Sequence, residues 1–176
     1  MKTLALLRHA KSEWDDMGTR DFDRGLNDRG RRGAQLIGRH IREHGIAFDR
    51  LIASSAARVQ QTLEAALPDV EPISDKRLYL ASVDTIIEVV QGHADGAGSV
   101  LVAGHNPGLQ EMLFALVAPN KENSLFDAAA TKYPTASFAV FELDIDDWTD
   151  LAADCGRLVH FKRPRDLDPA LGPETN

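Results

Sequence analysis

The chain has 176 residues, a length that fits one compact domain with a sizeable buried core. Hydrophobic residues make up 43% of it and charged residues 27%, which excludes a disordered chain, a collagen-like chain and a coiled coil. The net charge of −7 argues against binding to nucleic acid or an anionic membrane. Residues 1–50 nevertheless hold 11 Lys and Arg against 8 Asp and Glu, whereas residues 51–150 hold 5 against 15. This basic first segment predicts a local site for an anion.

The single cysteine, Cys155, excludes an internal disulfide framework and is typical of a reducing compartment. No apolar run approaches the roughly 18 residues that a transmembrane helix needs. The apolar stretch at residues 1–7 is too short for a signal peptide, because Arg8 and His9 interrupt it at once. We therefore expect a cytoplasmic protein.

The chain begins with an apolar run at residues 3–7, which is typical of a buried strand. The polar residues 10–27, rich in Asp and Arg, predict a loop. The apolar spacing over 28–44 then predicts a helix, with Asn27 as its N-cap and Gly45 at its C-terminal end.

A second buried strand is expected at residues 48–53. Ser54 has the chemistry of an N-cap for a helix that runs to about Leu67, before Pro68. Residues 69–80 are compatible with a short strand followed by a loop, and 83–91 have helical spacing.

Residues 92–98 predict a turn, and residues 99–103 a third buried strand. A helix over 108–117 follows it, and the polar residues 118–134 predict an irregular connection. Strands are expected again at 137–143 and 158–162.

Strands that alternate with helices predict a mostly parallel sheet covered on both faces. We see no internal repeat or linker, so we expect one domain over residues 1–165. The residues that follow, 166–176, contain two prolines and predict an irregular tail.

Three clusters of functional side chains lie just beyond the C-terminal ends of predicted buried strands. Arg8 and His9 end the first strand, Arg58 follows the second, and His105 follows the third. Open α/β sheets bind their ligands in the crevice at these strand ends. If the strands are parallel neighbours, the four side chains meet at one edge of the sheet.

Two arginines and two histidines around one pocket favour a phosphoryl group, because guanidinium forks match its oxygens. Arg58 is also expected in the first turn of its helix, where free N–H groups favour an anion. Neighbouring positive charges keep a histidine neutral, so His9 is the candidate to attack phosphorus. His105 is the candidate to donate hydrogen bonds to the oxygens in the transition state.

The remaining histidines give weaker signals. His40 and His44 are four residues apart on a predicted helix, a spacing that can bind zinc. No third ligand is evident among the interleaved charged residues, so a solvated helix face is the expectation, and no metal or cofactor is predicted. His93 and His160 have no partner that the sequence identifies. Sequence motifs of P-loop NTPases, zincins and serine hydrolases are missing from the sequence.

Three motifs in order resemble those of the histidine phosphatase superfamily, which has the phosphoglycerate-mutase-like fold. The first is Leu-Leu-Arg8-His9-Ala-Lys-Ser12, and the second is Ser54-x-x-x-Arg58-x-x-x-Thr62. The third, Gly104-His105-Asn106-Pro107, has the form found in the short branch that includes the SixA phosphohistidine phosphatases. The segment Asp23-Arg24-x-Leu26-x-x-x-Gly30 and the turn Tyr133-Pro134-Thr135 also look similar, and the match runs from residue 3 to about 165.

This resemblance implies a three-layer α/β/α fold and an enzyme that needs no cofactor. It implies that His9 becomes phosphorylated while Arg8, Arg58 and His105 hold the phosphoryl group. Ser12, Arg24 and Asn106, which lie in the matching segments, are expected to contribute to substrate binding.

The sequence departs from the larger relatives in being short, without the inserted region that often supplies an acid to the leaving group. Glu13, Asp21 and Asp23 are the carboxylates near the first motif. Ser55 stands where the family commonly has proline at the first helical position. A phosphohistidine substrate needs acid help less than an ester does, so the departure favours phosphohistidine on a protein.

Three functions remain open at this point. The first is a phosphohistidine phosphatase of the SixA type, the second a phosphomonoesterase on small metabolites, and the third a non-catalytic module that binds phosphate. Retention of His9 with His105 argues against the third, because binding alone needs chiefly the arginines.

Overall fold

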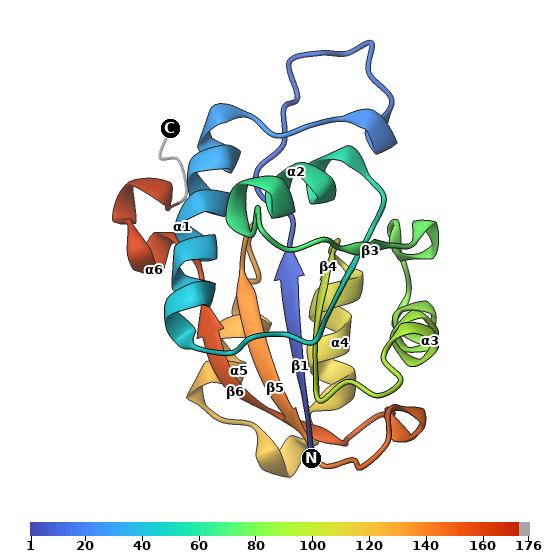
Figure 1. Cartoon of the computed structure of the whole chain (residues 1–176). Helices are drawn as coiled ribbons and strands as arrows, with labels where there is room; N and C mark the ends of the chain where they lie inside the picture. The colour runs from blue at the N-terminus through green and yellow to red at the C-terminus, as the bar shows by residue number, and fades with distance from the viewer. Residues whose placement is uncertain (173–176) are drawn as a thin grey trace.

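Six strands form a single sheet within residues 1–172, the part of the chain that this computed structural model describes (Figure 1). The strands are β1 (Lys2–Arg8), β2 (Arg50–Ala53), β3 (Ile73–Ser74), β4 (Ser99–Gly104), β5 (Phe138–Leu143) and β6 (Gly156–Lys162). Their order across the sheet is β3-β2-β4-β1-β5-β6, and the first four run parallel. β5 joins β1 antiparallel and β6 joins β5 antiparallel. The sheet is mostly parallel, which confirms the expectation.

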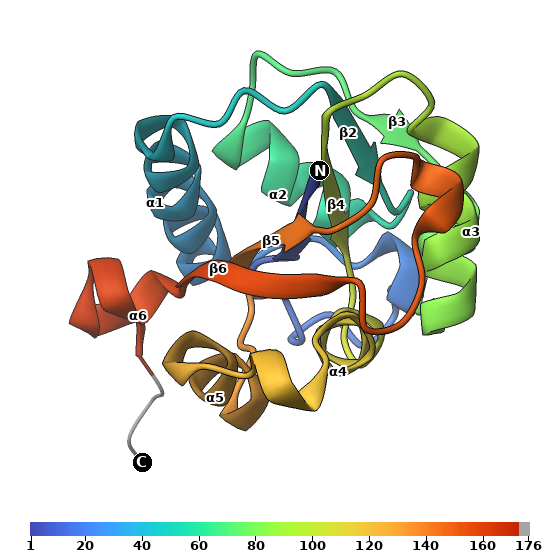
Figure 2. The same ribbon diagram turned by 90° about the horizontal axis from the view of Figure 1, so that it is seen from below.

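Helices cover both faces of this sheet (Figure 2). One layer contains α1 (Asp28–His44) and α2 (Ala57–Ala66), and the other contains α3 (Val83–His93), α4 (Gly108–Leu116) and α5 (Ser124–Thr131). Along β1, Ala5 and Leu7 belong to the core beneath α1 and α2, whereas Leu4 and Leu6 belong to the core on the other side. A strand buried on both faces reads as a continuous apolar run. The predicted three-layer α/β/α fold is confirmed.

Helix α1 has the predicted ends. The Asn27 side chain accepts a hydrogen bond of 2.7 Å from the backbone N–H of Gly30, and Gly45 ends the helix in the left-handed region at φ 89°. Gly30 also lies against the loop that follows β1, since a Cβ built there would come within 2.0 Å of the Lys11 carbonyl oxygen. Helix α1 therefore approaches this loop at a position that only glycine can occupy.

Four local expectations were wrong. α2 begins at Ala57 with Ala56 as its N-cap and without a side-chain cap, so Ser54 does not cap it. α3 runs on to His93, into the predicted turn. The connection 118–134 contains α5, whose N-cap Asn123 accepts a hydrogen bond from Phe126, and is not irregular throughout. Short 3-10 helices also punctuate the loops, at Asp21–Asp23, Lys76–Leu78, Pro119–Lys121 and Trp148–Asp150.

The predicted irregular tail, 166–176, is the fourth of these corrections. α6 (Pro164–Leu167) crosses its boundary, and the 3-10 helix Pro169–Leu171 follows. The segment packs on α1, where a Cβ built at Gly33 would lie 3.8 Å from the Pro164 side chain and Arg29 donates a hydrogen bond to the carbonyl of Gly172. The last four residues of that prediction, 173–176, lie outside the described residues.

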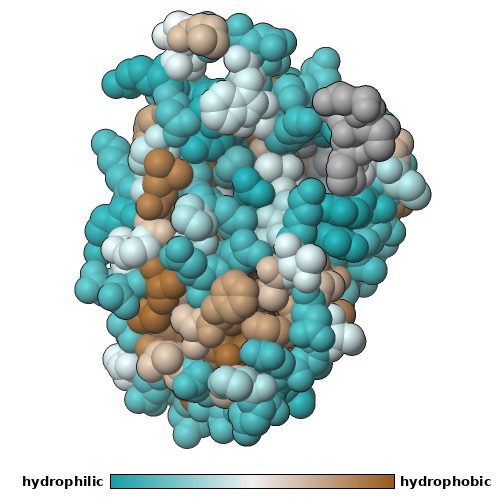
Figure 3. Space-filling view, turned by 180° about the vertical axis from the view of Figure 1, so that it is seen from behind, coloured by the Kyte–Doolittle hydropathy of each residue, from teal (hydrophilic) through white to brown (hydrophobic). Residues whose placement is uncertain are grey.

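The surface of the molecule is uneven in hydropathy. Seen from behind, hydrophobic side chains gather on the lower half of the molecule, on the side of α4 and α5, whereas the end at which β1 finishes is mostly hydrophilic (Figure 3). Within residues 1–172, no helix is both long enough and apolar enough to cross a bilayer.

Candidate active site

The functional side chains meet where the parallel strands end. Arg8 is the last residue of β1 and pairs with Gly104 on β4, so His9 and His105 leave neighbouring strands side by side. Their ring centroids lie 5.4 Å apart. Arg58 reaches the same place from the first turn of α2, which follows β2. All four line one cavity of about 490 Å³, as the strand-end argument predicted.

The lining of this cavity is strongly cationic. Its basic side chains come from Arg8, Lys11, Arg24, Arg29, Arg58, Lys132 and Arg165. No Asp or Glu lies among the described residues that line it. Such a cavity favours a dianion such as a phosphoryl group, in a protein whose net charge is −7.

His9 is held as a neutral base. Its Nδ1 lies 2.8 Å from the carbonyl oxygen of Ala10, which can only accept, so Nδ1 carries the hydrogen and Nε2 keeps its lone pair. Burial lowers the pKa of His9 to about 3, and the charges of Arg8 and Arg58 act in the same direction. We expected the arginines to be the main cause, but burial is the larger one.

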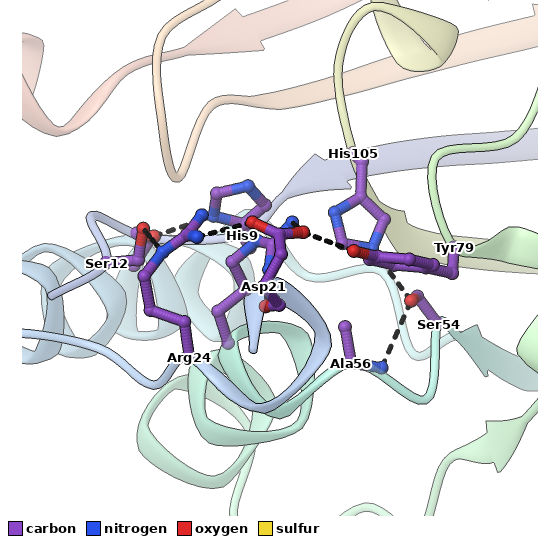
Figure 4. Close-up of polar contacts among 10 residues, drawn as sticks. His9, Ser12, Asp21, Arg24, Ser54, Ala56, Tyr79 and His105 are labelled. Carbon is purple, nitrogen blue, oxygen red and sulfur yellow. Dashed lines mark hydrogen bonds and ion pairs between the residues drawn. The ribbon is translucent and has the colours of Figure 1, made fainter. Parts of the chain in front are cut away.

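His105 is oriented by Ser54 (Figure 4). Its Nε2 lies 2.8 Å from the hydroxyl oxygen of Ser54, which also accepts a hydrogen bond of 3.2 Å from the backbone N–H of Ala56. The ring of Tyr79 packs edge-on against the imidazole at 5.4 Å. Burial, with the charge of Arg58, lowers the pKa of His105 to about 4, so this imidazole is also neutral near pH 7.

Hydrogen bonds to backbone carbonyl groups hold the two predicted arginines in place. Arg8 donates from Nη1 to the carbonyl oxygen of Tyr133 at 3.0 Å, and buried Arg58 donates to the backbone of Asp21 at 2.7 Å. Arg8 Nε, Arg58 Nε and His105 Nδ1 are buried without a hydrogen-bond partner in the structure. Unpaired buried polar groups are costly, so a ligand with several acceptor oxygens fits this set.

Asp21 is the carboxylate nearest to the four residues (Figure 4). It forms an ion pair of 3.1 Å with Arg58, a second with Arg24, and a hydrogen bond with the hydroxyl of Tyr79. The Tyr79 hydrogen bond and the two arginines hold the pKa of Asp21 well below its usual range. Asp21 is therefore ionised and has no proton to give in this arrangement.

Glu13 and Asp23, the other two carboxylates considered as proton donors, interact with other partners. Glu13 accepts a hydrogen bond of 2.8 Å from the backbone of Asp15, and Asp23 pairs with Arg20 at 2.7 Å. Neither lines the cavity.

The structure places the remaining predicted binding residues at the cavity wall. Ser12 accepts a hydrogen bond of 3.2 Å from Nε of Arg24, whose guanidinium stacks on Trp14 at 3.6 Å. The amide of Asn106 donates to the Tyr133 carbonyl at 3.0 Å, and its oxygen accepts from the backbone of Gln110. Their roles in binding substrate stay predictions.

Several site residues escaped sequence reasoning. Thr62 of the second motif joins the site's two halves: its hydroxyl accepts from the Ala10 N–H at 2.9 Å and donates to the Arg58 carbonyl at 2.7 Å. Ser54 was assigned as a helix cap, and Arg165, the last residue of the expected domain, was given no role. Ser54 could have been recognised from its place in the motif, whereas no signal in the sequence marks Arg165.

Comparison with known proteins adds independent evidence. Residues 4–79 match the model of the histidine phosphatase superfamily, branch 1. An uncharacterized protein of Mycobacterium tuberculosis is 34% identical over 160 residues, which cover 90% of this chain and all of that protein. The crystal structure of the putative phosphohistidine phosphatase SixA from Agrobacterium tumefaciens is 30% identical with a TM-score of 0.76, covering 93% of this chain and 98% of that one.

A second solved SixA structure, from Nakamurella multipartitia, is 31% identical with a TM-score of 0.80. It covers 93% of this chain and 96% of that one. The motifs, the cationic pocket at the strand ends and these full-length matches agree: the chain belongs to the histidine phosphatase superfamily, in its SixA-type branch.

Proposed function

We propose that the protein hydrolyses phosphohistidine on a protein substrate, through a phosphohistidine intermediate on His9. Membership of the superfamily supports phosphatase activity in the broader sense. The observation that carries the finer proposal is a neutral His9 in a cavity lined by arginines and by no carboxylate among the described residues.

In the first step, Nε2 of His9 attacks phosphorus and the P–N bond to the substrate imidazole breaks. The leaving imidazole takes a proton from solvent water, and the phosphoryl group stays on His9. Arg8, Arg58 and His105 stabilise the charge on the phosphoryl oxygens during the transfer. In the second step, water attacks phosphorus, the N–P bond breaks, and inorganic phosphate leaves with neutral His9 restored.

The choice of leaving group rests on Asp21. An ester substrate releases an alkoxide, which needs a proton donor to leave at a useful rate. Because Asp21 is paired with Arg58 and Arg24, it is held as an anion. A ring nitrogen leaves more readily than an alkoxide, so this site is better matched to phosphohistidine than to a phosphate ester.

The rim of the cavity supports a substrate carried by a protein. Trp14 and Leu80 line the cavity, yet their exposed fractions are 66% and 54%. Large apolar side chains exposed at the mouth of a pocket are typical of surfaces that contact another protein. A phosphorylated protein is therefore the proposed partner, and the cytoplasm, expected from the sequence, is the proposed location.

The test is a hydrolysis panel that compares a phosphohistidine protein with small phosphomonoesters. Wild type is expected to release phosphate fastest from the phosphoprotein. His9→Ala is expected to lose roughly 10³-fold or more on every substrate, because the nucleophile is gone. His93→Ala is the matched control, since His93 lies outside the cavity and pairs with Asp75 at 3.0 Å.

Equal rates for wild type and His9→Ala on every substrate would overturn the catalytic mechanism. Faster turnover of the small esters than of the phosphoprotein would overturn the substrate assignment and favour a phosphomonoesterase. An acid-labile phosphoryl label on wild type that is missing from His9→Ala would identify the intermediate directly.

A further inference from the structure

Three histidines outside the phosphate site lie together, two on the C-terminal part of α1 and one on β6. We call His40, His44 and His160 the α1 cluster. His40 and His44 are one helical turn apart on α1, and His160 comes from the middle of the edge strand β6. One ring nitrogen from each lies within 4.8 Å of the other two. From the sequence we expected no third ligand near His40 and His44 and no partner for His160, and the structure corrects both expectations by placing His160 against the other two.

The ring of His160 stacks with each of the other two rings, and the ring of Phe138 contacts all three. The His160 ring lies 5.0 Å from that of His40 and 4.1 Å from that of His44, and the ring of Phe138 on β5 packs edge-on against them. Phe138 is fully buried, so the three histidines pack against an apolar side chain of the core.

The cluster offers lone pairs rather than charges. Nε2 of His40 and Nε2 of His160 are 2.7 Å apart, close enough for a hydrogen bond between them. In such a bond one ring donates and the other accepts with an unprotonated nitrogen. An unprotonated imidazole nitrogen is the form that binds a metal ion.

The spacing fits one tetrahedral ion. With Zn–N bonds of about 2.0 to 2.1 Å, two ligand nitrogens of a tetrahedral site lie about 3.3 to 3.4 Å apart. The one short separation is 2.7 Å, and all three ligand atoms lie within 4.8 Å of one another, so the cluster is compact enough to surround one ion. The two nearest nitrogens would have to separate slightly for an ion to lie between them. None of the three side chains is fully buried, so water can reach a fourth position.

We propose that His40, His44 and His160 bind one divalent transition-metal ion of the zinc class. Imidazole ligands favour Zn²⁺, Ni²⁺ and Cu²⁺ over Mg²⁺ and Ca²⁺, which prefer oxygen. The ion joins α1 to the edge strand β6. Lys162 of β6 opposes a cation near His40, and Glu43 of α1 favours it.

The experiment is isothermal titration calorimetry, in which Zn²⁺ is added to the purified, chelator-treated protein. Wild type is expected to bind one ion per chain. His160→Gln and His44→Gln are expected to weaken that binding at least 10-fold each. His93→Gln, which removes a histidine from elsewhere on the surface, is expected to bind as wild type does.

A separate arm excludes the phosphate site, which also contains two histidines. His9→Ala is expected to keep the Zn²⁺ affinity of wild type, and loss of binding in this variant would assign the ion to the phosphate site and overturn the proposal. Unchanged binding by His160→Gln would overturn it as well.

Two further measurements guard against misfolding and weak surface binding. The far-UV circular dichroism of His44→Gln without metal is expected to match wild type, since its side chain lies at the helix surface. Co²⁺ in place of Zn²⁺ is expected to give the intense visible bands of tetrahedral coordination in wild type and in His9→Ala, and weaker bands in His160→Gln. An octahedral spectrum in wild type would contradict the three-histidine site.

Discussion

The molecule contains two groups of histidines whose surroundings point to opposite ligands. His9 and His105 stand among guanidinium groups, whereas His40, His44 and His160 stand on an aromatic ring with one lysine and one glutamate nearby. Burial lowers the pKa values of His9 and His105 to about 3 and about 4, and that of His160 to about 4. The rings are thus similar, and the neighbouring charges differ.

The difference shows that the charges around a neutral imidazole, and not the imidazole alone, decide which ligand it favours. Among arginines, the lone pair of His9 lies where an anion is favoured, and in the mechanism proposed above it attacks phosphorus. At His40, the positive charge of Lys162 is accompanied by the negative charge of Glu43, and we propose that a cation binds the lone pairs of this cluster. Each of the following predictions tests one side of this contrast.

The largest effect is expected from removing a guanidinium. Arg58→Ala takes away a buried charge that faces the phosphoryl oxygens, so kcat/KM should fall roughly 10²- to 10³-fold. Zn²⁺ affinity at the α1 cluster should not change, because Arg58 does not contact it. A steady-state assay and a Zn²⁺ titration of the same preparation measure both, and a parallel loss of both would indicate misfolding instead.

The second prediction concerns pH and stability. The folded-state pKa values of His9 and His105 lie below the value of about 6.5 expected in the unfolded chain, so the unfolded state binds more protons below pH 6.5. Their contribution to stability is complete above pH 6.5 and is lost progressively as the pH falls toward 4 and 3. Between pH 7.5 and 5.0 we expect these two residues to lower the free energy of unfolding by about 2 kcal/mol each, or about 4 kcal/mol together.

Urea unfolding of wild type and of the double variant His9→Ala, His105→Ala measures this difference. The double variant should lose less stability over the same pH interval. An identical pH dependence in the two proteins would show that these imidazoles are not held neutral by the fold.

The smallest effect is expected at Asp21, which competes with the substrate for Arg58. Asp21→Asn removes one negative charge next to the phosphate site, so inorganic phosphate should inhibit about 5-fold more strongly. Tyr79→Phe is the matched control, because it removes a hydrogen bond to Asp21 and keeps the carboxylate charge. Weaker inhibition in Asp21→Asn would mean that the carboxylate chiefly positions Arg58 and does not compete.

The sequence was sufficient to predict the convergence of Arg8, His9, Arg58 and His105, for a physical reason. Each of the four follows a buried strand, and parallel strands end at one edge of a sheet, so a local pattern fixes a distant contact. The caps of α1 were predicted equally well, because capping is a property of adjacent residues.

The rest depends on packing that a local pattern does not encode. α5 was missed because the polar residues before it, up to Asn123, hide an alanine-rich helix only eight residues long. His160 finds its partners only once α1 lies across the sheet. Arg165 enters the cavity because α6 packs on α1, which the prolines of the tail concealed.

The close approach of Gly30 to the Lys11 carbonyl has a consequence for anyone who reads this protein through a mutational screen. Glycine at 30 has no side chain with which to bind substrate, yet even a methyl group there would displace the backbone two residues beyond the nucleophile. Variants at this position should therefore score with the catalytic residues while folding normally elsewhere. A map of tolerated substitutions would therefore mark the contact between α1 and the loop after β1 as sensitive, although Gly30 itself takes no part in the reaction.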